Sequence, residues 1–283
     1  MNITTRCRLL LFLSFMSIFL SACNNNATEP VKEENKLMTV THNDNQQQHI
    51  EELEGGSELA SRVQEPVSFW TLQREYPDII AIRANNTQKM ALTFDDGPSE
   101  KYTPQILDVL KKHHAKATFF MMGSRAGAYP DIVKRIHEEG HAIGNHSYWH
   151  PNLNEANIDR MKKEISDTEN TIEQIVNMKP RIFRPPYGNL TREQVKALEQ
   201  MNLSAIMWSV DSSDWQQLSA EQIQKNVLSN IHPGAVILFH DGGHWTQDLS
   251  GTVEALDIII PKLQNDGIEL VTIPELFQIE GQQ

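Results

Sequence analysis

Side chains of the types that carry out hydrolysis occur in five short clusters, and each cluster directly follows a run of apolar residues. The clusters comprise residues 95–98, 145–150, 184–187, 211–215 and 240–241. They contain adjacent aspartates, paired histidines, an arginine, a further aspartate and a final histidine. Any one cluster alone is a weak signal. Because all five follow a predicted strand, we expect the fold to gather them at one place.

The first cluster contains two adjacent carboxylates, Asp95 and Asp96. Adjacent negative charges repel each other. A fold tolerates them when a cation or a basic partner lies beside them and the two groups have different roles. The alternative interpretation is a turn formed by aspartate before Gly97 and Pro98. The pair therefore indicates a cation site only in combination with other ligands.

The second cluster supplies such ligands, because His146 and His150 are four residues apart. On a helical turn this spacing places both imidazoles on one side, where they could bind the same metal ion. An isolated pair of this kind usually lies on a surface. Together with the carboxylate of Asp96, however, the pair forms a set of three ligands that leaves positions open for water and substrate. Such a set is typical of hydrolytic zinc and not of structural zinc.

Charge and cysteine content exclude several other classes of protein. The 283 residues include 25 Lys and Arg against 37 Asp and Glu, which gives a formal net charge of −12 and a sequence pI near 5.4. A nucleic-acid-binding protein needs surplus positive charge, so we expect no nucleic-acid partner. The two cysteines, Cys7 and Cys23, lie outside the body of the chain. A disulfide framework, a cysteine zinc site and a thiol nucleophile are therefore excluded.

The first residues have the pattern of an export signal. Arg6 and Arg8 precede an apolar segment over residues 9–20, which is shorter than the roughly 20 residues needed to span a bilayer. The segment ends in Leu20-Ser21-Ala22-Cys23, which resembles the lipobox of bacterial lipoproteins. We therefore expect residues 1–22 to be a lipoprotein signal peptide. Cys23 would then be lipidated and would hold the chain at the extracytoplasmic face of a bacterial cell membrane. A secretory signal with an incidental cysteine is the alternative.

Residues 23–65 are rich in Asn, Gln and Glu and poor in aromatic and β-branched residues. Such a segment cannot bury enough apolar surface to offset its ordering entropy, so we expect a disordered polar tether. The remaining residues, 66–283, should form one domain. The chain thus divides into a signal, a tether and a body.

The body alternates short apolar runs with helical patterns, which predicts parallel strands joined by crossover helices and hence an α/β fold. We expect strands within residues 90–94, 117–122, 141–144, 181–183, 204–210, 235–239 and 268–272. We expect helices within residues 103–113, 130–139, 158–176, 191–201, 220–230 and 253–265. The position of the polar clusters favours a distorted (β/α) barrel of about seven parallel strands. Its active site would lie at the carboxyl ends of the strands.

The five clusters resemble the five motifs of the polysaccharide deacetylases, which form carbohydrate esterase family four and are also called the NodB-homology domain. The motifs read TFDDGP, HSYWH, RPPYG, DSSDW and LFH, in the order found in that family. The resemblance covers about residues 88 to 279, and no catalytic position departs from the pattern. It implies a metal-dependent hydrolase.

The resemblance implies the roles of the central residues. Asp95 would be the general base and His240 the general acid. A divalent metal would be held by Asp96, His146 and His150. We expect Zn²⁺, although Co²⁺ and Ni²⁺ suit the same ligands.

The resemblance also implies supporting roles. Arg184 would orient the base and keep it ionised, and the backbone N–H of Tyr187 would contribute to an oxyanion hole. Asp214 would brace either Arg184 or the general acid. The residues expected to contact the substrate are Trp215, Leu238 and Pro186. The first two of these would wall a pocket for the acetyl methyl group, although both could instead be ordinary core residues.

The family acts on acetylated polysaccharides, and the expected export of the chain favours a cell-wall glycan. The resemblance therefore predicts removal of N-acetyl groups from N-acetylglucosamine units of peptidoglycan or chitin-like oligomers, with release of acetate, by a monomer. An O-acetyl ester hydrolase is one alternative. Another is a wall-binding lipoprotein without turnover, against which the intact Asp95 and His240 argue.

Overall fold

The structure, a computed structural model, describes residues 67–85 and 87–282. The expected signal peptide, the tether and the lipidation site Cys23 lie outside the described residues, and so does residue 66. Among the described residues, no helix has both the length and the apolar character needed to cross a bilayer.

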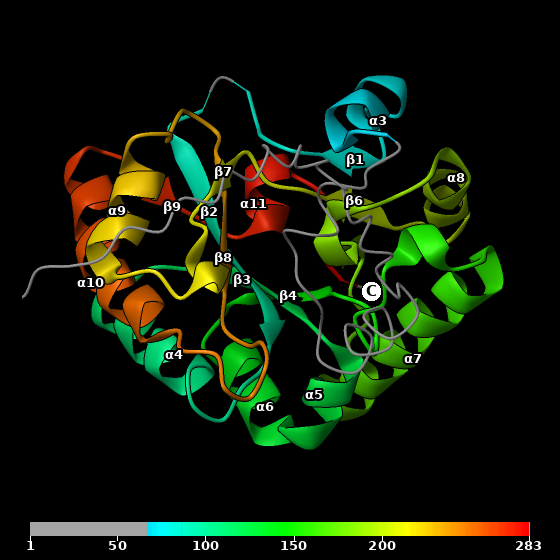
Figure 1. The fold of residues 1–283 in the computed structure, drawn as a ribbon, viewed down its shortest axis with the longest axis horizontal. Coiled ribbons are helices and arrows are strands. Elements are labelled where there is room, and N and C mark those ends of the chain that lie inside the picture. Colours follow the sequence, from blue (N-terminus) through cyan, green and yellow to red (C-terminus); the bar gives the residue numbers. More distant parts are fainter. Residues whose placement is uncertain (1–66, 86, 283) are drawn as a thin grey trace, which may run out of the picture. The chain divides into compact units, whose positions relative to one another are not determined.

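A sheet of nine strands lies at the centre of the described part of the chain, and every named strand pair in it is parallel (Figure 1). The strands are β1 (Ile80–Ala81), β2 (Lys89–Gly97), β3 (Ala117–Met121), β4 (Ala142–Asn145), β5 (Ile182–Phe183), β6 (Ser204–Ile206), β7 (Val210–Asp211), β8 (Val236–His240) and β9 (Glu269–Leu270). Their spatial order is β1-β6-β5-β4-β3-β2-β8-β7, and β9 also pairs with β2.

Each of the seven predicted strand runs contains a strand, but the run over residues 204–210 is divided. Its first half, β6, pairs with β1 and β5, whereas its second half, β7, pairs with β8. Because β6 and β7 lie near opposite ends of the strand order and only three residues separate them, the curved sheet almost closes on itself. The α/β barrel-like fold is confirmed, with nine short strands in the described residues instead of about seven.

Most of the helices lie around the outer side of the sheet (Figure 1). The helices are α3 (Phe69–Glu75), α4 (Thr103–Lys112), α5 (Gly123–Ala128), α6 (Pro130–Glu138), α7 (Ile158–Val176), α8 (Arg192–Gln200), α9 (Ala220–Leu228), α10 (Ser250–Asn265) and α11 (Ile273–Phe277). Three single-turn 3₁₀ helices are η1 (Leu153–Glu155), η2 (Pro186–Gly188) and η3 (Asp214–Gln216). All six predicted helices are present. The sequence patterns missed α3, α5 and α11, which are at most seven residues long.

Helix boundaries follow from local capping. The side chain of Asn157 accepts a hydrogen bond from the N–H of Arg160 at the start of α7, and Asn177 ends that helix in the left-handed conformation with φ 55°. Capping boxes begin α8 at Thr191 and α9 at Ser219. These caps fix the lengths of the crossover helices and thereby the positions of the strands between them.

Alternation along β2 separates two apolar clusters. Met90, Leu92 and Phe94 belong to the cluster that includes residues of α4 and α10, whereas Ala91 belongs to the cluster that includes residues of β5 and β6. Successive side chains of a strand point to opposite faces, so Asp95 lies on the same face as Ala91. The strand thereby directs Asp95 into the interior of the curved sheet, at its carboxyl end.

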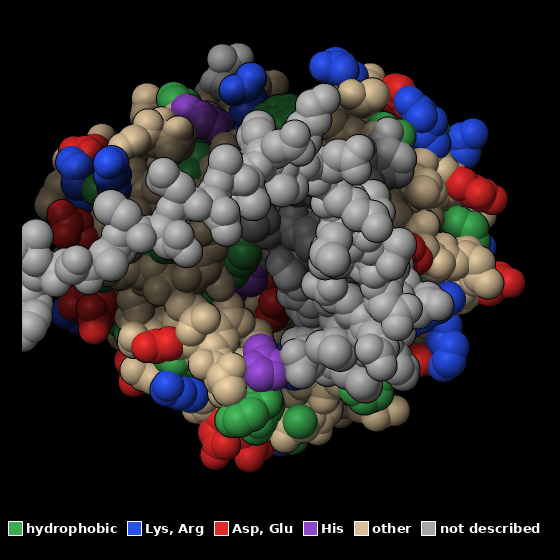
Figure 2. All heavy atoms as spheres, in the orientation of Figure 1, with side chains coloured by type: hydrophobic (Ala, Val, Ile, Leu, Met, Phe, Trp, Pro, Cys, Tyr) green, Lys and Arg blue, Asp and Glu red, His purple; other side chains and the backbone are tan. Residues whose placement is uncertain are grey.

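Charged side chains of both signs cover the surface. On the face shown in Figure 2, the described Lys and Arg side chains lie interspersed with Asp and Glu.

Candidate active site

The carboxyl ends of the strands bring the five predicted clusters together. In the β2–β8 pairing Asp95 stands opposite His240, and in the β4–β5 pairing Asn145 stands opposite Phe183, which directly precedes Arg184. Asp211 ends β7, which pairs with β8. The parallel pairing therefore places the ends of β2, β4, β5, β7 and β8 at one edge.

Three potential metal ligands converge at this edge. Oδ1 of Asp96 lies 3.3 Å from Nε2 of His146 and 3.2 Å from Nε2 of His150. All three side chains are buried, and their donor atoms lie within 4.8 Å of one another. Asp96 Oδ1 and His146 Nε2 have no hydrogen-bond partner among the described residues. Buried, converging donors without such partners fit a single divalent cation.

The hydrogen bonding of His146 favours metal binding through Nε2. Its Nδ1 lies 2.7 Å from the carbonyl oxygen of Arg184. A carbonyl oxygen can only accept, so Nδ1 carries the hydrogen. In the neutral ring the lone pair of Nε2 then faces the cluster, which is the usual arrangement of a histidine that binds a metal.

The same neighbours determine the charge of the cluster. Burial alone would raise the pKa of Asp96, but the imidazoles of His150 and His146 outweigh it and hold that pKa far below its usual range. Burial alone would lower the pKa of His146, but the carboxylates of Asp95 and Asp96 outweigh it and raise that pKa. The site thus combines an ionised carboxylate with imidazoles in a position suited to a cation.

The predicted helical turn between the two histidines is wrong. Residues 146–150 form a loop in which Ser147 and His150 have left-handed φ values of 63° and 60°. This backbone, not a helical turn, turns both imidazoles toward Asp96. Non-glycine residues in this conformation need support from their surroundings. Part of that support is local, because Oγ of Ser147 accepts the N–H of His150 at 3.0 Å.

Further support comes from Glu164 of α7, to which the sequence interpretation gave no role. Its Oε2 accepts the backbone N–H groups of Tyr148 at 2.9 Å and Trp149 at 2.8 Å, inside the loop between the histidines. Glu164 is 7% exposed and lies among the buried residues Met161 and Ile165 of the same helix. An acidic residue on the apolar face of a predicted helix is the signal that could have identified it.

Arg184 holds Asp95 from within the sheet. Its Nη1 donates to Oδ1 of Asp95 and to Oγ1 of Thr93, both at 2.8 Å. Its Nε and Nη2 donate to the carbonyl oxygens of Ile206 at 2.9 Å and Met207 at 3.2 Å. The guanidinium is fully buried, so its orientation is fixed by these four hydrogen bonds.

The second carboxylate oxygen of Asp95 faces the potential metal ligands. Oδ2 lies 3.8 Å from Nε2 of His146. Burial raises the pKa of Asp95, and Arg184 opposes this effect without cancelling it. A carboxylate with a raised pKa is a stronger base than an exposed one, as a group that must take a proton from water requires.

Of the two partners expected for Asp214, Arg184 and His240, the structure shows contact with His240. Oδ1 of Asp214 lies 2.7 Å from Nδ1 of His240, and Oδ2 accepts the backbone N–H of His240 at 2.9 Å. Oδ2 also accepts the hydroxyl of Thr252 at 2.8 Å. Both members of the pair are 1% exposed. The carboxylate therefore fixes the ring so that Nδ1 carries a hydrogen and Nε2 is the atom available for proton transfer.

The remaining predicted site residues lie in the same region of the fold. Tyr187 has a left-handed φ of 61°, and its ring forms a T-shaped contact with the ring of His150 at a centroid distance of 4.6 Å. Pro186 is buried in η2, and Trp215 is half-buried in η3 beside Asp214. Leu238 is fully buried in β8. Their contacts with a substrate stay predictions.

A second acidic residue, Asp241, supports the turn that carries the two aspartates. Its N–H donates to the carbonyl oxygen of Asp95 at 3.1 Å, and the hydroxyl of Thr103 donates to its Oδ2 at 2.6 Å. A Cβ atom on Gly97 would lie 2.1 Å from the same carboxylate, so only glycine fits there. Burial raises the pKa of Asp241 to about 7, although the hydrogen bond from Thr103 lowers it.

Comparison with known proteins agrees with this arrangement. The polysaccharide deacetylase family matches residues 83–206. A peptidoglycan-N-acetylglucosamine deacetylase of Bacillus cereus is 48% identical over 195 residues, which are 68% of this chain and 70% of that protein. The peptidoglycan-N-acetylglucosamine deacetylase PgdA of Listeria monocytogenes is 40% identical over 195 residues, which are 69% of this chain but 40% of that protein.

A solved structure supports the same relationship. The crystal structure of a peptidoglycan N-acetylglucosamine deacetylase superimposes with a TM-score of 0.73 at 44% sequence identity, and it covers 76% of this chain and 100% of that chain. The resemblance of the five motifs is thus confirmed by sequence relatives and by fold. The Bacillus cereus relative is 48% identical to this chain, and the match covers 70% of the length of that relative. The chain therefore belongs to the polysaccharide deacetylase family.

Proposed function

We propose that this chain is a metal-dependent hydrolase that removes N-acetyl groups from N-acetylglucosamine residues of peptidoglycan and releases acetate. One observation carries the proposal. The buried cluster of Asp96, His146 and His150 lies at the same strand ends as a carboxylate held by Arg184 and an imidazole held by Asp214. These are the three parts that hydrolysis of an amide requires.

The proposed metal ligands are Asp96, His146 and His150, and the proposed metal is Zn²⁺, with Co²⁺ and Ni²⁺ compatible with the same donors. When bound, such a cation supplies Lewis acidity toward the acetyl carbonyl and the attacking water. Side chains and one backbone N–H group of the chain itself are proposed to carry out the other steps.

Asp95 is proposed to take the proton from the attacking water. Oδ1 of this carboxylate is bonded to Arg184, so Oδ2, on the side of His146, is the oxygen that accepts the proton. The oxygen of the water then forms the new bond to the acetyl carbon. The backbone N–H of Tyr187 is proposed to donate to the oxygen that gains negative charge.

His240 is proposed to donate a proton from Nε2 to the nitrogen of the substrate. The C–N bond then breaks, the glucosamine leaves as a neutral amine, and the acetyl group leaves as acetic acid and ionises to acetate. An amine is a poor leaving group without protonation, so a buried imidazole held by Asp214 suits an amide substrate. We therefore rank N-acetyl groups above O-acetyl esters.

We favour peptidoglycan over chitin-like oligomers as the glycan, because the peptidoglycan-N-acetylglucosamine deacetylases reported above are 48% and 40% identical to this chain, whereas two chitooligosaccharide deacetylases are 34% and 36% identical. Trp215 and Leu238 are proposed to wall the pocket for the acetyl methyl group, and Pro186 is proposed to contact the substrate. Leu238 and Pro186 are buried close to the strand ends that carry His240 and Arg184. The chain is proposed to act as a monomer, without a nucleic-acid partner.

A release assay tests this function. Full-length protein stripped of metal should release no acetate from peptidoglycan, and addition of Zn²⁺ should restore release. Chitooligosaccharide and acetylated xylan serve as comparison substrates. Undiminished release by metal-free protein would overturn the metal-dependent mechanism. Faster release from acetylated xylan than from either N-acetylated glycan would favour the ester hydrolase, and no release from any glycan would favour a wall-binding protein without turnover.

Lipid anchoring at Cys23 is a separate proposal that rests on the sequence around residues 20–23. A lipidated Cys23 would place the domain at the extracytoplasmic face of the cell membrane on the tether of residues 23–65. Cys23→Ser should release the protein from membranes or leave it unprocessed, while the purified body keeps its activity. Native protein that is free of lipid and cleaved elsewhere would contradict the anchor but not the enzyme.

A further inference from the structure

The first turn of α5 contacts three loops of the candidate active site, and none of the steps above uses it. The first N–H groups of any helix have no partner within that helix. Met122, the residue before α5, provides no side-chain cap for them. Its own N–H donates to the carbonyl oxygen of Gly97 at 3.0 Å, and Gly97 directly follows Asp96. The chain therefore enters α5 from the turn that carries one of the candidate metal ligands.

The next two residues contact the loop between the two histidine ligands. The N–H groups of Gly123 and Ser124 donate to the carbonyl oxygens of Ser147 at 3.0 Å and Tyr148 at 3.2 Å. The approach is close, because a Cβ atom on Gly123 would lie 2.4 Å from the ring of Tyr148 and 2.9 Å from Cα of Thr168 in α7. Since the backbone of α7 cannot give way, a larger residue here would push the loop away from α5.

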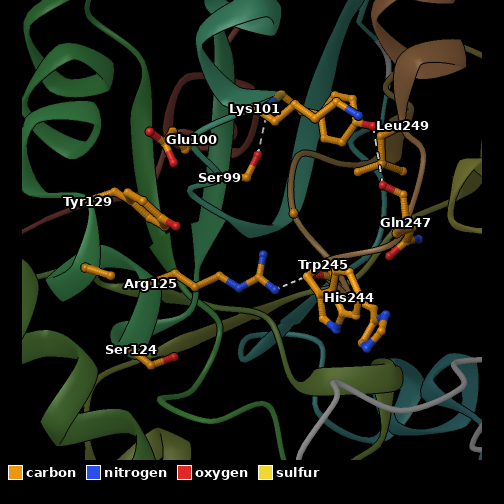
Figure 3. A pocket seen from close by; sticks show the side chains of 14 residues that line it. Ser99, Glu100, Lys101, Ser124, Arg125, Tyr129, His244, Trp245, Gln247 and Leu249 are labelled. Carbon is orange, nitrogen blue, oxygen red and sulfur yellow. Dashed lines mark hydrogen bonds between the residues drawn. The ribbon is translucent and has the colours of Figure 1, made fainter.

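The fourth residue, Arg125, contacts the loop that follows His240. In Figure 3 its side chain extends across a cavity of about 480 Å³ to this loop, where Nη2 donates to the carbonyl oxygen of Gly243. A Cβ atom on Gly242 would lie 2.5 Å from Nη1 of Arg125 and 2.2 Å from the carbonyl oxygen of Asp96. Gly242 therefore contacts both the guanidinium and the backbone of Asp96.

The loops that α5 contacts have a backbone conformation that needs support. Asp96 has a left-handed φ of 70°, and Ser147 and His150 have values of 63° and 60°. Non-glycine residues keep this conformation only when the surrounding structure holds them in it. The first turn of α5 is a single element that contacts both loops, so it can fix the position of one relative to the other.

We propose that the first turn of α5 positions the metal ligands, with Gly123 and Arg125 as its positioning residues. Gly123 lets the turn approach the loop between the two histidines, and Arg125 holds Gly242 against the backbone of Asp96. Neither residue binds the metal or the substrate. The proposal rests on the metal ligands of the proposed function.

Metal binding by the full-length protein tests this role without turnover. The Zn²⁺ dissociation constant is measured by competition with a chelating dye, and the visible absorption of the Co²⁺-loaded protein reports the ligand geometry. We expect Gly123→Ala to weaken Zn²⁺ binding about 10- to 100-fold and Arg125→Met about tenfold, as loss of support around metal ligands does. Both should change the Co²⁺ spectrum. Arg125→Lys keeps a charged donor for Gly243 and should recover most of the affinity.

Matched controls separate this role from general effects of substitution. Gly127→Ala adds the same methyl group later in α5, where it would meet Cγ2 of Thr171 at 3.5 Å, an ordinary contact. Arg74→Met removes an exposed arginine of α3. Both should bind Zn²⁺ as the parent does and give its Co²⁺ spectrum.

Parent-like Zn²⁺ affinity and Co²⁺ spectrum in both test variants would overturn the proposal. A higher KM of Arg125→Met with unchanged Zn²⁺ affinity would also overturn it, because Arg125 would then contact the substrate. If circular dichroism shows that Gly123→Ala does not fold, Arg125→Met and Arg125→Lys decide the question alone. A parent that binds no Zn²⁺ would overturn the proposed ligands and this proposal with them. A parent that binds Zn²⁺ but releases no acetate would count against the proposed function alone.

Discussion

Replacing Asp214 by Asn would test whether His240 acts through a charged, oriented imidazole. The carboxylate of Asp214 accepts three hydrogen bonds, from Nδ1 and the backbone N–H of His240 and from the hydroxyl of Thr252. An amide has one oxygen, so it cannot keep all three. If the amide oxygen takes the place of Oδ2, it keeps the hydrogen bonds from the backbone N–H of His240 and from the hydroxyl of Thr252. The NH₂ group then points at Nδ1. This orientation forces the hydrogen of the neutral ring onto Nε2.

The expected loss follows from the bond that disappears. The protonated imidazole, which is the form that donates the proton, loses a hydrogen bond to an ionised carboxylate, worth about 1.5–3 kcal/mol. At about 1.36 kcal/mol for each factor of ten in rate, Asp214→Asn should lower kcat by about 10- to 150-fold. Thr252→Val removes only the hydroxyl donor and leaves both contacts to His240, so its effect should be smaller than tenfold.

Acetate release at saturating Zn²⁺ gives kcat, and elemental analysis gives the metal content of the same samples. Metal content should stay normal, because within the described part of the chain Asp214 contacts His240, Thr252 and its own loop, and these lie apart from the three candidate metal ligands. Asp108→Asn, an exposed acid in α4, is the control for loss of a carboxylate elsewhere. An unchanged kcat, or loss of metal from Asp214→Asn, would refute this assignment of His240.

Four further substitutions probe other parts of the structure. Asp95→Asn should keep its metal and lose turnover by about 10²–10⁴, whereas Asp96→Asn should lose metal affinity and recover part of its rate in excess Zn²⁺; the opposite pattern would reverse the two roles. Glu164→Ala removes the acceptor of two loop N–H groups and should weaken Zn²⁺ binding by about 10- to 100-fold in a competition titration with a chelating dye, and normal affinity would count against this support. Burial lowers the pKa of His141 to about 4. The unfolded chain therefore binds a proton at this residue before the folded protein does, and about 3 kcal/mol of the free energy of unfolding is lost as the pH falls from 6.5 toward 4. Urea unfolding of His141→Asn should lack that part of the pH dependence, and an identical pH dependence would contradict this account.

Long, periodic elements could be predicted from the sequence because their patterns are local. Helix α7 was predicted with its observed bounds, since apolar residues recur at helical spacing and Asn157 and Asn177 cap it. β1 and α5 were missed because two or six residues are too few to show a period. The division of residues 204–210 into β6 and β7 depends on which neighbours each half pairs with, and no local pattern encodes that.

Those residues of the candidate site that lie within a motif could be predicted from the sequence. The candidate metal ligands Asp96, His146 and His150 are an example. The partner of Asp214 could not be chosen, because both candidates lie in other motifs and only the packing of η3 beside β8 decides between them. Glu164 was also missed. Its role arises from contacts between segments distant in sequence, for which the sequence offers no spacing rule.

The complete burial of Arg184 limits how a chain of this kind can lose its activity during evolution. A variant that loses the Asp95 carboxylate also leaves a guanidinium charge in the interior without its counterion, and breaking a buried ion pair in this way costs about 3–5 kcal/mol. Since domains have only about 5–15 kcal/mol of stability, such a step removes a large share of it. An inactive descendant therefore persists only when a second change replaces the arginine or supplies another acid. We therefore expect Arg184 and the Asp95 carboxylate to change together in divergent sequences.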